Sequence, residues 1–160
     1  MTPGTLTLFT GKMGAGKTTC SKLLAAQHHA VRLSEDEWLA AVYPDQIKTL
    51  KDYLVYSNRL KPQMKKLVQS MLSVGTNVVM DFPGNTRQQR SWLKNLADEV
   101  NATHQLVFLD VPDGVCLQRI EQRRNNQPER AATDTAEVFH QVSRFFEPPD
   151  EDEGFDVVRL

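Results

Sequence analysis

The 160-residue sequence has few cysteines, no long apolar run and almost no net charge. Its two cysteines, Cys20 and Cys116, are far apart and form neither a metal-ligand spacing nor a disulfide framework. No stretch of about 20 apolar residues is present to cross a bilayer, and the first residues lack the basic, apolar and small-residue succession of a signal peptide. We therefore expect a cytoplasmic protein with no membrane contact and with reduced thiols.

An excess of one charge sign is also missing. Nineteen Lys and Arg residues stand against 20 Asp and Glu, a formal net charge of −1, so no overall positive field attracts nucleic acid or an anionic membrane. A local basic patch is still compatible with this balance. A chain of 160 residues has the length of one ordinary domain. A single domain over residues 1–160 is therefore predicted.

What the sequence does contain is an alternation of short apolar strands and amphipathic helices. Strands are expected over residues 5–10, 31–33, 77–82, 105–111 and 155–160. Helices are expected over residues 17–29, after Ser34, and over 47–74, 86–101, 113–126 and 135–146. Pro62 is expected to kink or restart the longest of these helices. Alternating strands and helices specify a parallel sheet covered on both faces, so an α/β fold is predicted.

One motif carries specific chemistry. Residues 11–18 read GKMGAGKT and lie between an expected strand and an expected helix, as a P-loop requires. Glycines let backbone amides turn towards phosphate oxygens, and the helix N-terminus adds its positive end. Lys17 is predicted to reach the β- and γ-phosphates of ATP, and Thr18 to offer its hydroxyl to Mg²⁺. The predicted nucleotide-binding residues here are Gly11, Met13, Gly14, Ala15, Gly16, Lys17, Thr18 and Thr19.

Two carboxylates are candidates for the chemistry beside the phosphates. Asp81 ends an apolar strand, at the sheet edge where α/β folds bind ligands. It is predicted to hold Mg²⁺ or its waters, or a substrate hydroxyl; the alternative is an Asp that only begins the Pro83–Gly84 turn. Asp36 follows the second strand, where it can accept the proton of an attacking hydroxyl. Glu35 and Glu37 compete for that role, and all three acids also suit a helix N-terminus.

Arginines form a third group of candidates. Arg119 and Arg123 stand four residues apart on one helix face, and Arg124 and Arg130 extend the positive group into a polar loop. Guanidinium groups on a mobile loop can stabilise a transferring phosphate and exclude water, so a lid is predicted over residues 123–134. The alternative is an exposed arginine helix paired with acids at positions 121 and 129.

Two further charged groups have no fixed role from sequence. Arg87 and Arg90 flank the turn after Asp81, so they are candidates to hold an anionic acceptor, or they are ordinary surface charges. The acidic run Asp150 to Glu153 is predicted to be a solvated loop.

In combination, these segments resemble the small P-loop kinase group of AAA-type ATP-binding proteins, similar to polynucleotide 5′-kinase and more loosely to zeta toxin, chloramphenicol phosphotransferase and gluconate kinase. The matching pieces are GKMGAGKTT at Gly11, LSEDEW at Leu33, NVVMDFPGNTRQQR at Asn77, FLDVPDGVCLQRIEQRR at Phe108 and PPDEDEGFDVV at Pro148. The resemblance implies a three-layer P-loop NTPase sandwich with strand order 2-3-1-4-5 and an ATP and Mg²⁺ site. It also implies that Asp36 is the general base, that Arg119 lies by the nucleotide and that Arg123 is the lid arginine on the phosphates.

One position departs from that family pattern. Members commonly carry Asp-x-x-Arg after the second strand, whose arginine binds an acceptor phosphate, whereas here Leu39 stands three residues after Asp36. A phosphorylated acceptor such as a nucleic-acid 5′ end is therefore disfavoured. The leading hypothesis is an ATP-dependent kinase that acts on a hydroxyl of an unidentified small molecule. A nucleic-acid 5′-hydroxyl kinase and a nucleotide-dependent switch that binds a protein partner are the alternatives.

Overall fold

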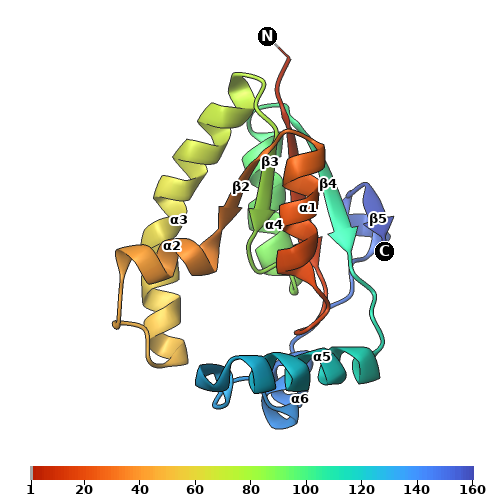
Figure 1. The fold of residues 1–160 in the computed structure, drawn as a ribbon. Coiled ribbons are helices and arrows are strands. Elements are labelled where there is room, and N and C mark those ends of the chain that lie inside the picture. The colour runs from red at the N-terminus through yellow and green to blue at the C-terminus, as the bar shows by residue number, and fades with distance from the viewer. Residues whose placement is uncertain (1) are drawn as a thin grey trace.

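The computed structural model describes residues 2–160 and arranges them around a five-stranded sheet (Figure 1). The strands are β1 (Thr5–Thr10), β2 (Val31–Ser34), β3 (Val78–Asp81), β4 (Thr103–Phe108) and β5 (Val157–Arg159). Their order is β2-β3-β1-β4-β5, and every neighbouring pair is parallel. The predicted α/β class and the strand order are therefore confirmed.

Helices connect these strands, and local sequence explains where several of them begin. They are α1 (Lys17–Gln27), α2 (Glu35–Val42), α3 (Leu50–Ser73), α4 (Arg87–Asp98), α5 (Asp113–Asn126) and α6 (Ala136–Ser143), with the short 3₁₀ helices η1 (Pro128–Arg130) and η2 (Glu151–Glu153). The hydroxyl groups of Ser34, Thr49 and Thr86 accept hydrogen bonds from backbone N–H groups in the first turns of α2, α3 and α4. Such caps satisfy donors that have no partner inside the helix.

Helix α3 does not restart at Pro62, which was one of the two predicted outcomes, because it runs without interruption from Leu50 to Ser73. A proline inside a helix removes one hydrogen bond and crowds the preceding turn. On the opposite side of the helix, Leu60, Met64, Val68 and Leu72 are buried, at the spacing that places one apolar stripe against the core. Burial of that stripe outweighs the local cost, and α3 forms as one helix.

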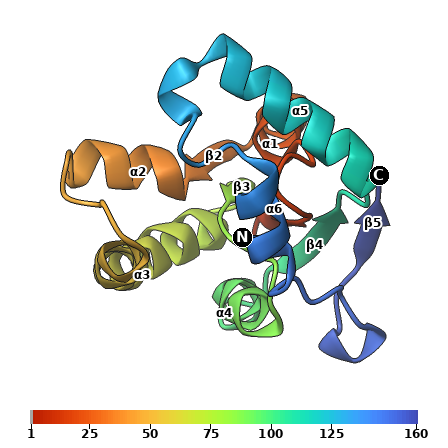
Figure 2. The same cartoon turned by 90° about the horizontal axis from the view of Figure 1, so that it is seen from below.

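The two faces of the sheet carry different helices, which gives three layers (Figure 2). One core joins Leu6, Leu8, Val78 and Met80 of the sheet to buried side chains of α3 and α4. The other core joins Phe9, Val79 and Val107 to α1, α5 and α6, through residues such as Cys116, Ile120 and Phe139. Because the strands are parallel, their carboxyl ends meet at a single edge, where the predicted site residues follow β1, β2 and β3.

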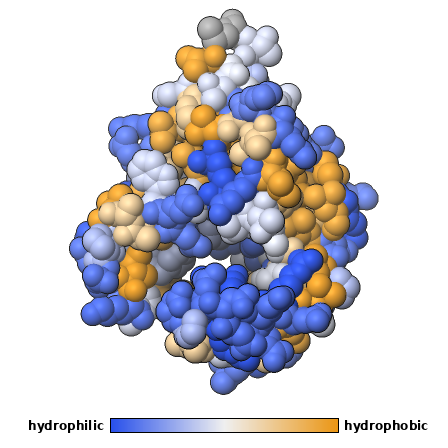
Figure 3. All heavy atoms as spheres, in the orientation of Figure 1, coloured by the Kyte–Doolittle hydropathy of each residue, from blue (hydrophilic) through white to orange (hydrophobic). Residues whose placement is uncertain are grey.

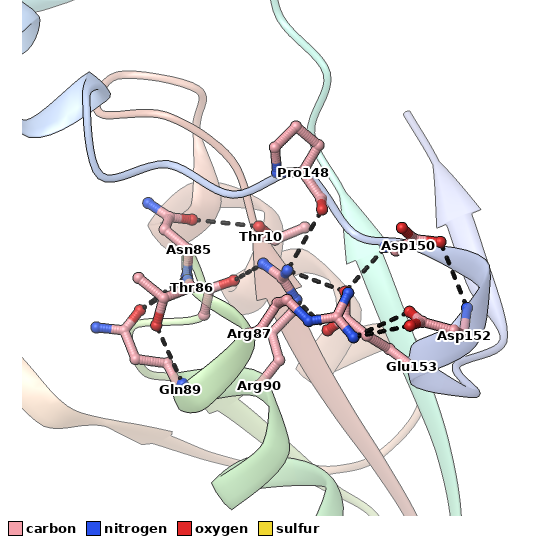
Figure 4. A network of polar contacts seen from close by, with 11 residues as sticks. Thr10, Asn85, Thr86, Arg87, Gln89, Arg90, Pro148, Asp150, Asp152 and Glu153 are labelled. Carbon is pink, nitrogen blue, oxygen red and sulfur yellow. Dashed lines mark hydrogen bonds and ion pairs between the residues drawn. The ribbon is translucent and has the colours of Figure 1, made fainter.

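A buried arginine ties the segment before β5 to helix α4. Arg90 is fully buried, and its Nε and Nη2 atoms donate to the two carboxylate oxygens of Glu153 at 2.8 and 3.1 Å (Figure 4). Arg90 Nη1 also donates to the carbonyl oxygen of Gly84 at 3.1 Å, and the more exposed Arg87 pairs with Asp152 at 3.0 Å. The expectation of a solvated acidic loop is therefore wrong at Glu153, whose side chain is only 8% exposed.

Removal of the Glu153 carboxylate tests this connection. We expect Glu153→Ala to lower the free energy of unfolding by about 3 kcal/mol, because Arg90 would stay buried without a counter-charge. Asp152→Ala is the matched control and is expected to cost clearly less stability, because its pair with Arg87 is exposed. Urea denaturation followed by circular dichroism measures both values. Equal losses for the two variants would show that Arg90 does not depend on Glu153.

Candidate active site

The loop between β1 and α1 forms one wall of a cleft at the carboxyl edge of the sheet. Gly14 and Gly16 have φ angles of 80° and 98°, a left-handed conformation that glycine adopts at no steric cost. A Cβ atom on Gly14 would lie 2.7 Å from the carbonyl oxygen of Cys116, so glycine also lets α5 approach the loop. The N–H of Gly11 donates to Asn85 Oδ1 at 3.0 Å, which fixes the start of the loop to the turn after β3.

The cleft has a volume of about 670 Å³, a size typical of small-molecule sites. Figure 3 shows the surface hollowed between the body of the sheet and the α5–α6 segment below it. Most predicted site residues line it, although they come from four separate segments: Met13, Gly14, Ala15, Gly16, Lys17, Thr18, Thr19, Asp36, Asp81, Arg119 and Arg123. Gly11 is buried behind the loop. Arg87 and Arg90 are not part of this lining, because the acids of the 150–153 segment bind both of them.

Asp81 joins strand β3 to the first turn of α1. Thr18 Oγ1 donates to Asp81 Oδ2 at 2.9 Å, and Arg32 Nη2 donates to the same oxygen at 2.9 Å. Arg32 is itself held by Ser21 Oγ of α1 at 2.8 Å. Sequence reasoning missed Arg32; the signal for it was a basic residue inside a four-residue strand directly before an acidic helix start. Arg32 fixes the orientation of the Asp81 carboxylate.

Lys17, Asp36 and Asp81 influence one another inside the cleft. Burial lowers the pKa of Lys17, while the carboxylates of Asp81 and Asp36 act in the opposite direction. The pKa of Asp36 is raised, mainly because protein atoms displace water from its carboxylate and then because of the negative charge of Asp81. The residue still reaches solvent. An anion bound between these groups would stabilise the charged form of Lys17.

The three neighbouring acids at the start of α2 have different surroundings. Glu35 is 3% exposed and accepts hydrogen bonds from the hydroxyls of Tyr53 and Ser57, the latter at 2.9 Å. Glu37 is exposed and lies 3.3 Å from Arg32. Asp36 lines the cleft and makes no side-chain hydrogen bond or ion pair with any residue in the range 2–160. Of these three acids, Asp36 is the one that lines the cleft and has a carboxylate without a hydrogen-bond or ion-pair partner among residues 2–160.

The predicted lid residues are organised by an acid that sequence reasoning missed. Asp134 is fully buried and accepts hydrogen bonds from Arg123 at 2.7 and 2.8 Å and from Arg130 at 2.7 Å. Burial alone would raise the pKa of Asp134, but the two guanidinium groups hold it below its usual value. The sequence feature that could have indicated Asp134 is its position four residues after Arg130. Arg119 instead donates to the carbonyl oxygen of Ala15 at 3.0 Å, so it lies against the loop between β1 and α1.

Solved structures with the same fold cover nearly the whole chain. Mycobacterium tuberculosis APS kinase CysC, solved with AMPPNP and APS, has a TM-score of 0.65 and 18% identity over 100% of this chain and 89% of its own. Chaetomium thermophilum Kti12, solved with ADP-AlF3, has a TM-score of 0.69 and 16% identity over 97% and 88%. A Chloroflexus aurantiacus protein has a TM-score of 0.73 and 21% identity over 100% and 86%. The chain therefore has a kinase-like P-loop NTPase fold.

Sequence comparison adds the family. The AAA domain family matches residues 6–149, and the chain belongs to that family. No curated protein sequence matches the chain. Within residues 2–160, every helix is too short or too polar to cross a bilayer.

The surroundings of Glu35 give a prediction about pH. Burial raises its pKa above the ordinary value of 4.5, so the folded protein retains a proton that the unfolded chain releases. The free energy of unfolding of the wild type should therefore fall, relative to Glu35→Gln, as the pH rises from about 4.5 through the raised pKa. Urea denaturation of both proteins between about pH 4.5 and 8 measures this difference.

Glu37→Gln is the control for that experiment, because Glu37 is exposed on the same helical turn. Its difference from the wild type should not show the fall expected for Glu35. A difference between wild type and Glu35→Gln that stays constant with pH would contradict the buried, proton-retaining carboxyl.

Proposed function

We propose that this chain is an ATP-dependent kinase that transfers the γ-phosphate to a hydroxyl group of a small-molecule acceptor. The observation that carries the proposal is a single cleft in which the Thr18–Asp81 hydrogen bond of 2.9 Å lies beside Lys17, with the uncommitted Asp36 in the same lining. The nucleotides bound to CysC and Kti12, which share the fold, support a nucleotide in this cleft.

The residues at the start of α1 fit a nucleotide with its Mg²⁺ ion. The backbone amides of residues 11–18 and the α1 N-terminus suit the phosphates, while the Thr18 hydroxyl and the Asp81 carboxylate are oxygen donors of the kind that Mg²⁺ prefers. Residues 2–160 contain no cluster of three or more His, Cys, Asp or Glu side chains able to hold a metal ion. This fits an ion held largely by phosphates and water, which would neutralise charge on the transferring group.

The remaining cleft residues supply positioning and charge. Lys17 binds the β- and γ-phosphates, and Arg119 and Arg123 face the same cleft, where guanidinium groups balance the charge that spreads over the phosphoryl oxygens. Asp134 holds the Arg123 guanidinium in a two-point contact. As the acceptor oxygen bonds to the γ-phosphorus and the bond to the β-phosphate oxygen breaks, Asp36 takes the acceptor's proton and ADP leaves.

A small acceptor is favoured over a nucleic-acid 5′ end. The basic side chains that sequence offered for an anionic acceptor, Arg87 and Arg90, are bound to Asp152 and Glu153. Leu39 stands where the related kinases carry a phosphate-binding arginine, and it is buried in the core. None of these three positions therefore offers a free cation for a phosphate ester on the acceptor.

Replacement of the proposed base tests the mechanism. We expect Asp36→Asn to lower kcat for phosphotransfer by about 100-fold or more, because the variant cannot take the acceptor's proton. Its affinity for ATP should stay close to that of the wild type, because Asp36 acts on the acceptor. A metabolite panel incubated with labelled ATP identifies an acceptor, and steady-state kinetics on that acceptor give kcat.

Glu37→Gln is the matched control and should retain activity, since Glu37 lies outside the cleft lining. Unchanged transfer by Asp36→Asn would refute the assigned base. ATP hydrolysis without any phosphorylated product from the metabolite panel or from oligonucleotides would favour the nucleotide-dependent switch instead.

A further inference from the structure

A second cavity adjoins the active cleft. It has a volume of about 460 Å³ and lies between α3, α4 and the turn after β3. The two cavities share Glu35, Phe82 and Pro83 in their walls. The second cavity therefore adjoins the cleft along this shared wall, in which Glu35 directly precedes Asp36 of the cleft.

One wall of this second cavity is aromatic. Trp92 of α4 is partly buried and its ring centroid lies 6.3 Å from that of Phe82. Lys61 of α3 places its Nζ atom 5.4 Å from the centre of the Trp92 ring. A flat or ring-shaped ligand can pack against such a surface, which is the kind of apolar contact that dominates small-molecule sites.

The other walls carry polar groups that are free to bind a ligand. The side-chain amides of Asn58 and Gln88 line the cavity, and neither is hydrogen-bonded to another residue in the described range 2–160. An amide both donates and accepts hydrogen bonds, as a hydroxyl group does. Two such amides beside an aromatic wall match a ring compound whose edge carries several hydroxyl groups.

Charge in the cavity argues for an uncharged ligand. Among the residues that line it, Lys61 is the one basic side chain and Glu35 the one acid. The Lys61 charge lies near that of Glu35 and lowers the pKa of this carboxyl, against the larger raising effect of burial. No arginine is present to bind a phosphate or carboxylate at two points. A phosphate group on the ligand would find one lysine here and no two-point partner.

We propose, on the basis of the proposed kinase function, that the second cavity is the acceptor subsite and binds an uncharged ring compound that carries several hydroxyl groups. The ring packs against Trp92, and Asn58 and Gln88 bind its hydroxyls. One remaining hydroxyl passes the shared wall of Glu35 and Pro83 and meets Asp36. A sugar, a cyclic polyol and a nucleoside all have this chemistry.

Fluorescence of Trp92 tests the subsite without nucleotide. The chain has two tryptophans, so Trp38→Phe leaves Trp92 as the single reporter. The titrants are glucose, myo-inositol and uridine, each compared with its phosphate ester. At least one uncharged titrant should change Trp92 emission saturably and bind about tenfold or more tightly than its ester.

Variants made in the Trp38→Phe protein measure how much each polar side chain of the cavity contributes to ligand affinity. Asn58→Leu and Gln88→Leu should each weaken that binding by about tenfold, the loss of one net hydrogen bond. Lys61→Gln should weaken it by less than about threefold if the ligand is uncharged. Lys66→Gln, on an exposed part of α3, is the control and should change nothing.

Two results would overturn the proposal. One is the absence of any saturable change in Trp92 emission with the uncharged titrants. The other is tighter binding of the phosphate esters, together with loss of that binding in Lys61→Gln, which would identify an anionic ligand.

Further outcomes separate the subsite from the kinase function. Binding of an uncharged titrant without transfer of phosphate from MgATP would support the subsite and refute the kinase function. Phosphate transfer to an acceptor whose KM is unchanged in Asn58→Leu would support the kinase function and refute the subsite.

Discussion

The hydrogen bond between Thr18 and Asp81, 2.9 Å long, is the contact on which the rest of the site depends. It joins the first turn of α1 to the end of β3, and it exists because β3 lies directly beside β1 in the sheet. The parallel order brings the loop after β1 and the acid after β3 to one edge. Arg32 holds the same carboxylate from β2, so three adjacent strands fix one carboxylate beside the loop.

Arginine–carboxylate pairs hold three parts of the structure in place. Arg32 with Asp81 sets the edge of the sheet, Arg123 and Arg130 with Asp134 shape the 123–134 segment, and Arg90 with Glu153 holds the chain before β5. Pairs of this kind have fixed two-point geometry when guanidinium and carboxylate planes meet. The consequence for function is that Arg32 orients Asp81 and Asp134 orients Arg123 in the cleft lining. The side chains of Lys17 and Asp36 keep free polar atoms in the same cleft.

Local sequence patterns predicted much of the fold and several residues of the cleft, but they did not predict the arginine–carboxylate pairs that hold the cleft residues in place. The alternation of strands and helices predicted the parallel α/β class, and the resemblance to the small P-loop kinases supplied the strand order. The GKMGAGKT segment and the acids after the second and third strands predicted the cleft residues Lys17, Thr18, Asp36 and Asp81. The partners of Arg32 and Arg90 were not predictable, because each arginine and its acid lie 49 and 63 residues apart and only the fold brings them together. Strand β4 ends at Phe108 and not at residue 111, since pairing with β1 stops there, which apolar character alone does not reveal.

The central claim is that residues 11–18 bind the polyphosphate of a nucleotide, and calorimetric titration with MgATP tests it most directly. The account predicts saturable binding by the wild type, an affinity about ten- to 100-fold weaker in Lys17→Ala, which loses a charge-assisted contact, and no change in Lys22→Ala, whose side chain is exposed on α1. Absence of binding by the wild type, or equal affinity in the wild type and Lys17→Ala, would contradict it.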